Sequence, residues 1–344
     1  MMKKTLVALA AVAVTGGAFA QATLTGGVAF GYTQTALAAT SGGTGAITSG
    51  MGADGAWLDF GATEELDGGI KIATSIGIDV GVSGVASAGR DAYITASGGF
   101  GTVQIGSVKG GSYLSAGVAG AGAVKNSGLD GLVLPARSAK DTINWTIPLV
   151  DGLKAKIDAE ENDVVEGTGT AGSTAQRRTT YSLTYAAGAL TLTGGYRSFD
   201  QQGTGSSETL YASGTRAAAS YDMGVAKIGF GVENYTAPYG NTRSSTLVGL
   251  NVPLGALSIG AQLATNTTAG SATAANNQTL NAALLAASYS VSKRTTLIAE
   301  YVQSDVGYVS SAGATAFVTT TSAYTAAGTY GKQNFTGVYI YHSF

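Results

Sequence analysis

The stretch at residues 70–80, IKIATSIGIDV, alternates between apolar and polar side chains with a period of two. One face would carry Ile70, Ile72, Ile76, Ile78 and Val80, and the other Lys71, Ser75 and Asp79. Because successive side chains of a β-strand point to opposite faces, this pattern predicts a strand with one apolar and one polar face. Such a strand fits a soluble sandwich, or a membrane barrel whose apolar face meets lipid and whose polar face lines the lumen.

The same alternation recurs along the chain and predicts sixteen strands. The expected strands span residues 22–35, 54–66, 69–80, 90–98, 101–108, 140–148, 152–160, 178–187, 189–199, 209–222, 225–235, 243–253, 255–266, 278–290, 294–307 and 332–344. Tight turns join some of them, and longer segments rich in Gly, Ser, Thr and Ala join the others, at 36–53, 108–139, 161–177 and 308–331. An even number of strands with short turns at one end and long loops at the other is typical of outer-membrane barrels. We therefore predict an all-β fold, a transmembrane antiparallel β-barrel.

The composition excludes several functional classes. The chain has 344 residues, no Cys and a single His, so zinc–thiolate sites, cysteine nucleophiles and multi-His metal sites have no ligands to use. The net charge is −2 and no basic stripe is visible, which argues against nucleic-acid binding. Residues 244–292 carry no charge, but they are rich in Thr, Asn, Gln and Ser and have the period of strands, not of spanning helices. We expect no cofactor and no metal.

The N-terminus has the pattern of an export signal. Lys3 and Lys4 precede a short apolar stretch at residues 5–14, and Ala18-Phe19-Ala20 matches a signal-peptidase site. The apolar stretch is too short to span a bilayer. We therefore expect a signal peptide at residues 1–20 and a barrel at residues 21–344.

Several blocks of sequence resemble one family. Residues 58–71, LDFGATEELDGGIK, are similar to the second hairpin of Gram-negative general-diffusion porins, of the proteobacterial type. Residues 89–94 and 99–106 resemble the next hairpin, and residues 289–295, YSVSKRT, resemble a turn near the end of such porins. The final residues, 337–344, resemble their last strand with its terminal Phe.

The resemblance implies a water-filled channel in the outer membrane for passive diffusion of ions and small hydrophilic solutes. It further implies a homotrimer, contacts with outer-membrane lipid and lipopolysaccharide, and recognition of Phe344 by the barrel-assembly machinery. In the family, the third loop folds into the barrel and narrows it, with acidic groups facing basic ones on the wall. The third loop would lie within residues 108–139.

The candidate constriction residues follow from this resemblance. Asp130 is the only acid between Gly110 and Arg137. The basic candidates are Lys71, Arg90, Lys109, Arg137 and Lys140. Residues such as Trp57, Tyr339 and Tyr341 stand where the family often has basic residues, so we expect only weak ion selectivity, tilted toward cations.

Three other functions remain to be weighed. A substrate-selective channel of the same fold would need an aromatic track or a dense binding site in the lumen, at which Trp57, Tyr339 and Tyr341 hint. A secreted adhesin rich in Gly, Thr and Ala would share the composition, although the chain lacks the fixed repeat of a solenoid. An outer-membrane enzyme would need a base beside a Ser, and His342 lies in the expected last strand, so we expect no enzyme activity.

Overall fold

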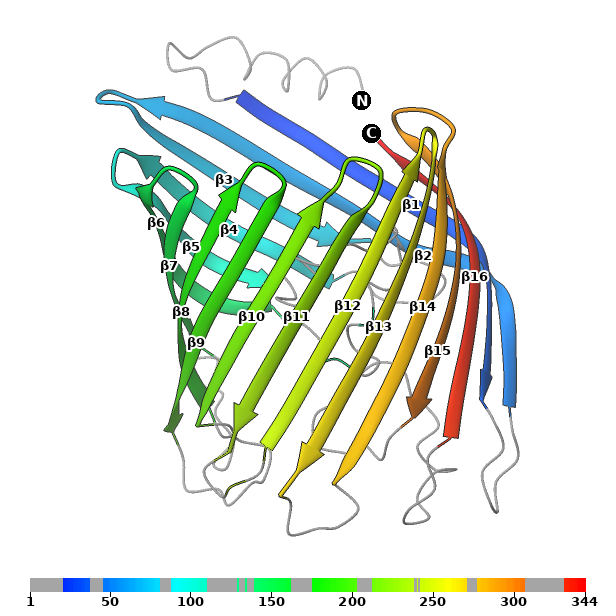
Figure 1. Ribbon diagram of the computed structural model, residues 1–344. Helices are drawn as coiled ribbons and strands as arrows, with labels where there is room; N and C mark the ends of the chain where they lie inside the picture. Colours follow the sequence, from blue (N-terminus) through cyan, green and yellow to red (C-terminus); the bar gives the residue numbers. More distant parts are fainter. Residues whose placement is uncertain are drawn as a thin grey trace, which may run out of the picture.

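The computed structural model describes a closed barrel (Figure 1). The described residues are 21–37, 46–80, 88–109, 129, 134, 139–161, 175–202, 212–237, 240, 242–270, 277–306 and 331–344. Within them, sixteen antiparallel strands follow one another around the barrel in sequence order, and β1 pairs with β16 to close it. The predicted all-β fold and the strand number are confirmed. The expected signal peptide at residues 1–20 lies outside the described residues.

The strands mostly begin and end within a few residues of the expected positions. They are β1 Gln21–Leu37, β2 Ala46–Leu66, β3 Ile70–Asp79, β4 Ala88–Gly98, β5 Gly101–Lys109, β6 Ala139–Val150, β7 Leu153–Glu161, β8 Ala175–Ala187, β9 Leu190–Gln202, β10 Ser213–Asp222, β11 Lys227–Thr236, β12 Thr242–Leu254, β13 Leu257–Ala269, β14 Gln278–Ser290, β15 Thr295–Val306 and β16 Gly331–Ser343.

The second strand is longer than predicted. Residues 46–53 were expected in a loop, but they pair with β1 as far as the Leu37–Ala46 pair. The register shifts between Ala29 and Phe30, where the partner changes from Gly55 to Ala53. Such a bulge moves the alternation by one residue, so the period-two signal in the sequence is interrupted although the strand continues.

The outer face of the barrel is apolar around its whole circumference. Large side chains that point outward are exposed on every part of the sheet, and examples are Ile76, Ile94, Ile143, Leu183, Phe230, Val248, Leu263, Leu285 and Val338. A water-soluble protein does not expose an apolar surface of this extent, whereas a membrane barrel covers it with lipid. Among the described residues, there is no helix long and apolar enough to cross a membrane.

The barrel closes where the C-terminal residue meets β1. Gly26 and Phe344 exchange two backbone hydrogen bonds of 3.1 and 3.0 Å. The Phe344 ring lies over Gly26 beside Leu58, since a Cβ added to Gly26 would be 2.5 Å from that ring. The predicted outward direction of Val338, Ile340, His342 and Phe344 agrees with their exposure. Glycine at position 26 therefore leaves the space in which Phe344 completes the seam.

Replacing Phe344 with alanine is expected to lower the yield of folded barrel. The change removes the ring that covers Gly26 and Leu58, whereas the backbone hydrogen bonds of the seam can still form. The measurement is the fraction of protein in membranes whose gel mobility changes on heating. Tyr289→Ala is the matched control, because Tyr289 also points outward near a short turn and is 50% exposed, as is Phe344. Equal yields for the two variants would contradict the role of Phe344 in closure.

Candidate functional site

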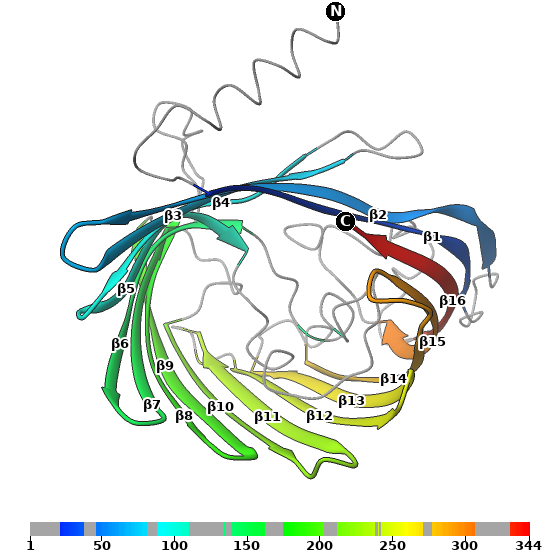
Figure 2. The same cartoon turned by 90° about the horizontal axis from the view of Figure 1, so that it is seen from above.

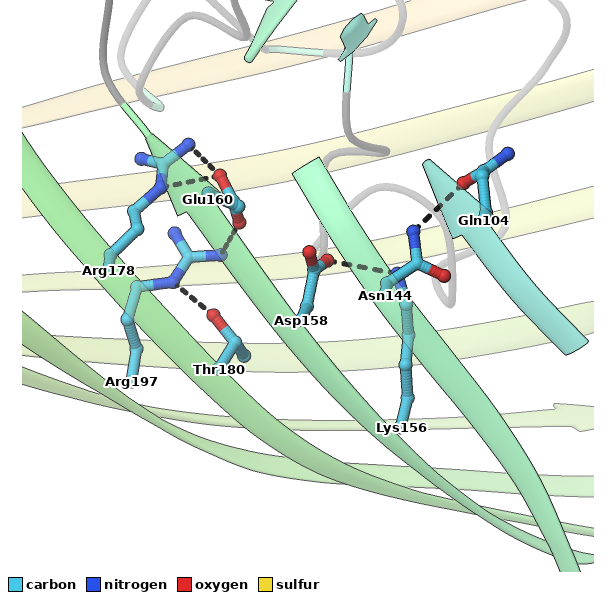
Figure 3. A network of polar contacts seen from close by, with 8 residues as sticks. All are labelled: Gln104, Asn144, Lys156, Asp158, Glu160, Arg178, Thr180 and Arg197. Carbon is cyan, nitrogen blue, oxygen red and sulfur yellow. Dashed lines mark hydrogen bonds and ion pairs between the residues drawn. The ribbon is translucent and has the colours of Figure 1, made fainter. Parts of the chain in front are cut away.

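A carboxylate shared by two arginines lies on the lumen side of β7, β8 and β9 (Figure 3). Glu160 forms ion pairs with Arg178 and with Arg197, the latter at 3.1 Å between Nη2 and Oε1. Arg197 also donates a hydrogen bond of 2.7 Å from Nε to the Thr180 hydroxyl. The Glu160 side chain is only 8% exposed. These contacts hold both guanidinium groups against the wall.

A second group of the same kind follows on β10, β11 and β12. Glu233 forms an ion pair with Arg216, at 2.7 Å between Nε and Oε2, and accepts a hydrogen bond of 3.0 Å from Arg243 Nη2; its side chain is 4% exposed. Both guanidinium groups also lie near the ring of Tyr235, with Arg243 4.6 Å from its centre and Arg216 5.7 Å. The Tyr235 ring lies over Gly214, where any Cβ would collide with it. Cation–π contacts of this kind fix the orientation of an arginine.

Together these residues form one charged region, which we call the arginine tract: Arg178, Arg197, Arg216 and Arg243 with Glu160 and Glu233. Four positive and two negative charges leave a net charge of +2. All six side chains retain some exposure and belong to the consecutive strands β7–β12. A solute crossing the lumen would pass a wall with an excess of guanidinium donors, which attract anions.

A smaller charged group lies on β2, β3 and β4. Arg90 Nε is 3.3 Å from Asp79 Oδ1, and its guanidinium lies 4.8 Å from the ring centre of Trp57. Asp59 is close as well, because a Cβ on Gly77 would be 2.4 Å from its Oδ1 and 2.8 Å from Arg90 Cβ. In a ring of sixteen strands, β3 lies across the lumen from β11 (Figure 2). The structure therefore places the predicted residue Arg90 across the lumen from the arginine tract.

The other predicted constriction residues are less fully described. Lys71 is exposed and pairs with Glu65 and Ser97, one residue after the start of β3, so it lies near the short-turn end. Lys140 lies near the start of β6 and is half-buried. Lys109 ends β5, and its side chain is not described. Asp130 and Arg137 lie outside the described residues.

The arginine tract was not among the residues predicted from the sequence. The predicted residues were those that match the family pattern, and they lie mainly on the early strands. The sequence did contain a signal for these residues, the alternation of inward and outward side chains along each strand. Arg197 lies on the face opposite Tyr196, and Arg216 lies on the face opposite Tyr221. Both tyrosines point outward. Assigning inward and outward positions on every expected strand would have identified the tract without reference to the family pattern.

Two acidic side chains near the end of β7 form ion pairs on the lumen wall. Asp158 accepts Lys156 Nζ at 3.0 Å, and Glu160 belongs to the arginine tract. Nearby, Asn144 donates a 2.9 Å hydrogen bond to Gln104 (Figure 3). Among the described residues, no group of three or more His, Asp or Glu side chains could hold a metal ion. His342 lies on the outer face, 2.9 Å from the Thr295 hydroxyl.

Comparison with known proteins agrees with the barrel fold. A family model described as Gram-negative porin matches residues 5–308. No match is found among curated proteins.

Solved structures share the fold at low sequence identity. An anion-selective porin from Comamonas acidovorans has a TM-score of 0.66 and 20% identity. A porin refined at 1.8 Å resolution has a TM-score of 0.63 and 12% identity, and a variant of the Rh. blastica porin has 0.62 and 14%. Each alignment covers 94% of this chain and 100% of the other.

Removing the carboxylate of Glu160 is expected to destabilise the barrel. In Glu160→Gln, the guanidinium groups of Arg178 and Arg197 lose the negative charge that they share. This loss is expected to lower the free energy of unfolding by about 1–3 kcal/mol. The measurement is urea unfolding in detergent micelles, followed by tryptophan fluorescence. The control is Asp79→Asn, since Asp79 is 60% exposed and an exposed pair contributes about 0–1 kcal/mol. Equal losses for both variants would show that burial of Glu160 has no energetic consequence.

Proposed function

The chain belongs to the Gram-negative porin family and is an outer-membrane channel for passive diffusion, and we propose that its arginine tract favours small anionic solutes. The observation that carries this proposal is the excess of guanidinium groups on the lumen side of β8–β12. The sequence alone suggested a weak preference for cations, but that expectation took no account of these four arginines. The name of the Comamonas acidovorans neighbour, an anion-selective porin, agrees with the proposal.

We propose that transport needs neither catalysis nor a cofactor. The single histidine points away from the lumen, and the tract offers fixed charge and hydrogen-bond donors but no nucleophile with a base beside it. A substrate-selective channel of the same fold remains the second candidate, because Tyr235 holds two arginines of the tract in fixed orientation. A lumen lined with ion pairs does not support the alternative function of a secreted adhesin.

The constriction predicted from the family stays part of the proposal. We propose that Asp130 on the third loop faces Arg90, Arg137 and Lys140, with Lys71 and Lys109 contributing charge nearer the two ends of the lumen. Among these residues, Arg90 has the best structural support, since it already lies beside Asp79 and Trp57 on the lumen wall.

We also propose a route of export and assembly from the N-terminal sequence pattern and the family resemblance. A cleaved signal peptide at residues 1–20 would direct the chain through the inner membrane, and the barrel-assembly machinery would read the last strand with Phe344. The apolar outer face supports contact with membrane lipid, and its loop end would meet lipopolysaccharide.

The ion preference is tested by the double variant Arg197→Gln, Arg216→Gln in planar bilayers. Loss of two charges near a permeating ion changes its free energy by about 1 kcal/mol, so the anion-to-cation permeability ratio should fall about fivefold. The reversal potential in a salt gradient measures this ratio. Arg294→Gln is the matched control, because Arg294 is exposed in a short turn. A cation-selective wild-type pore, or equal ratios for both variants, would refute the proposal.

We expect a homotrimer whose contacts include the early strands. Outward-facing side chains there are small at Val28 and Ala62, which allows close packing of barrels. Unheated protein should therefore migrate as a trimer in dodecyl sulfate gels, and conductance should close in three equal steps. A single step together with monomeric migration would contradict this assembly.

A further inference from the structure

Two aromatic side chains lie next to each other on the lumen wall of β16, β1 and β2. These strands are neighbours, since β1 lies between β16 and β2 (Figure 2). The Tyr341 ring lies over Gly27 of β1, because a Cβ added to this glycine would be 2.7 Å from the tyrosine hydroxyl and 2.9 Å from Cε2. Gly27 pairs directly with Trp57 of β2. The glycine therefore lets the tyrosine extend across β1 toward the indole.

Open space lies beside the two rings. Gly55 pairs with Ala29, and Ala29 pairs on its other side with Tyr341, so these positions share the inward face. A Cβ added to Gly55 would meet nothing within 4 Å in the described part of the chain. Trp57 and Tyr341 are both half-buried, so part of each ring is accessible from the lumen. The wall at this place offers aromatic surface next to bare backbone.

Polar groups lie on the other side of the indole. The Arg90 guanidinium is 4.8 Å from the ring centre of Trp57, and its Nε is 3.3 Å from Asp79 Oδ1. The Asp79 side chain is 60% exposed. The Asp59 carboxylate is close to Arg90, since both approach Gly77. One positive and two negative charges leave a net charge of −1 here. We call this group the ring platform: Trp57, Tyr341, Asp59, Asp79 and Arg90.

A pyranose sugar is the class of solute that suits both the rings and the polar groups. The C–H face of a pyranose is slightly positive, so it packs against an aromatic ring, whose face is negative. The sugar hydroxyls can donate hydrogen bonds to carboxylates and accept them from a guanidinium. An anion suits the platform less well, because the net charge is negative. An organic cation would compete with Arg90, which already lies over the indole.

We propose that the ring platform binds the pyranose rings of neutral sugars inside the channel. In a ring of sixteen strands, β1 and β2 lie across the lumen from β9 and β10, which carry Arg197 and Arg216. Sugars and anions therefore contact different parts of the wall. Binding in a channel must be weak enough for the solute to leave, so we expect a low affinity that still saturates. The proposal rests on the proposed function only in assuming a solute path through this lumen.

Tryptophan fluorescence tests the proposal, since the chain has only two tryptophans. Trp145 points outward, and Trp145→Phe leaves Trp57 as the single tryptophan. Glucose and maltotriose should change the emission of Trp57 along a saturating curve. Sorbitol is the matched control solute, because it carries similar hydroxyl groups on an open chain and has no ring face. A response to glucose that does not saturate, or an equal response to sorbitol, would overturn the proposal.

Two further variants in this background separate the second ring from the open space. Tyr341→Ala removes one ring and should raise the dissociation constant for maltotriose about tenfold. Gly55→Leu keeps both rings but fills the space beside them, and it should weaken binding as well. Tyr289→Ala is the matched control, because Tyr289 points outward. Unchanged affinity in either platform variant, with folding shown by heat-modifiable mobility, would contradict the proposed site.

The sugar site and the proposed anion preference can fail separately. Maltotriose should lower the ion current of the wild-type channel, and Trp57→Ala should need about tenfold more sugar for the same effect. Arg197→Gln, Arg216→Gln should change the reversal potential and leave the sugar effect unchanged. A cation-selective channel that still binds maltotriose would refute the anion preference alone. If tetramethylammonium changes the emission of Trp57 and glucose does not, the platform binds cations and the sugar proposal is wrong.

Discussion

Everything in this barrel depends on the need to pair each backbone N–H and C=O group where no water can reach it. A sheet that crosses lipid cannot leave an edge, so its first and last strands must meet. Here β1 and β16 pair from Gly27 with Ser343 to Leu37 with Gln333, and Gly26 with Phe344 extends the seam. Closure then gives every side chain one of two environments, lipid outside or the lumen inside.

The unusual glycine content follows in part from this closure. Fifty-two glycines are far more than turns require. Several lie in strands where an aromatic ring rests on the wall: Tyr339 lies over Gly31 and Gly337, and Tyr235 over Gly214. A ring beside a strand glycine shields the bare backbone and takes a fixed orientation. Glycine thereby lets large side chains lie flat on the lumen wall instead of filling the channel.

Sequence reasoning was most successful where one physical rule applies to one strand at a time. Alternation, turn residues and the apolar faces gave the strand number, the outer face and the direction of the last strand. It failed for the first part of β2, because the bulge at Gly55 and Ala53 reverses the alternation. The lumen is harder, since alternation says that Leu247 and Leu284 point inward but not that Leu129 and Leu134 cover them. That contact joins distant parts of the chain, and no local pattern encodes it.

The charge-free stretch at residues 244–292 acquires a meaning from this arrangement. It forms nearly all of β12–β14, where buried apolar side chains such as Leu247, Ala264 and Leu284 point inward, while the arginine tract lies on β7–β12 and a smaller charged group on β2–β4. At physiological salt, a fixed charge acts over a Debye length of about 8 Å. In a wide lumen, a solute could therefore pass the arginine tract at a distance where its charge is screened. The tract can discriminate between ions only where the solute path runs within about one Debye length of the wall formed by β8–β12.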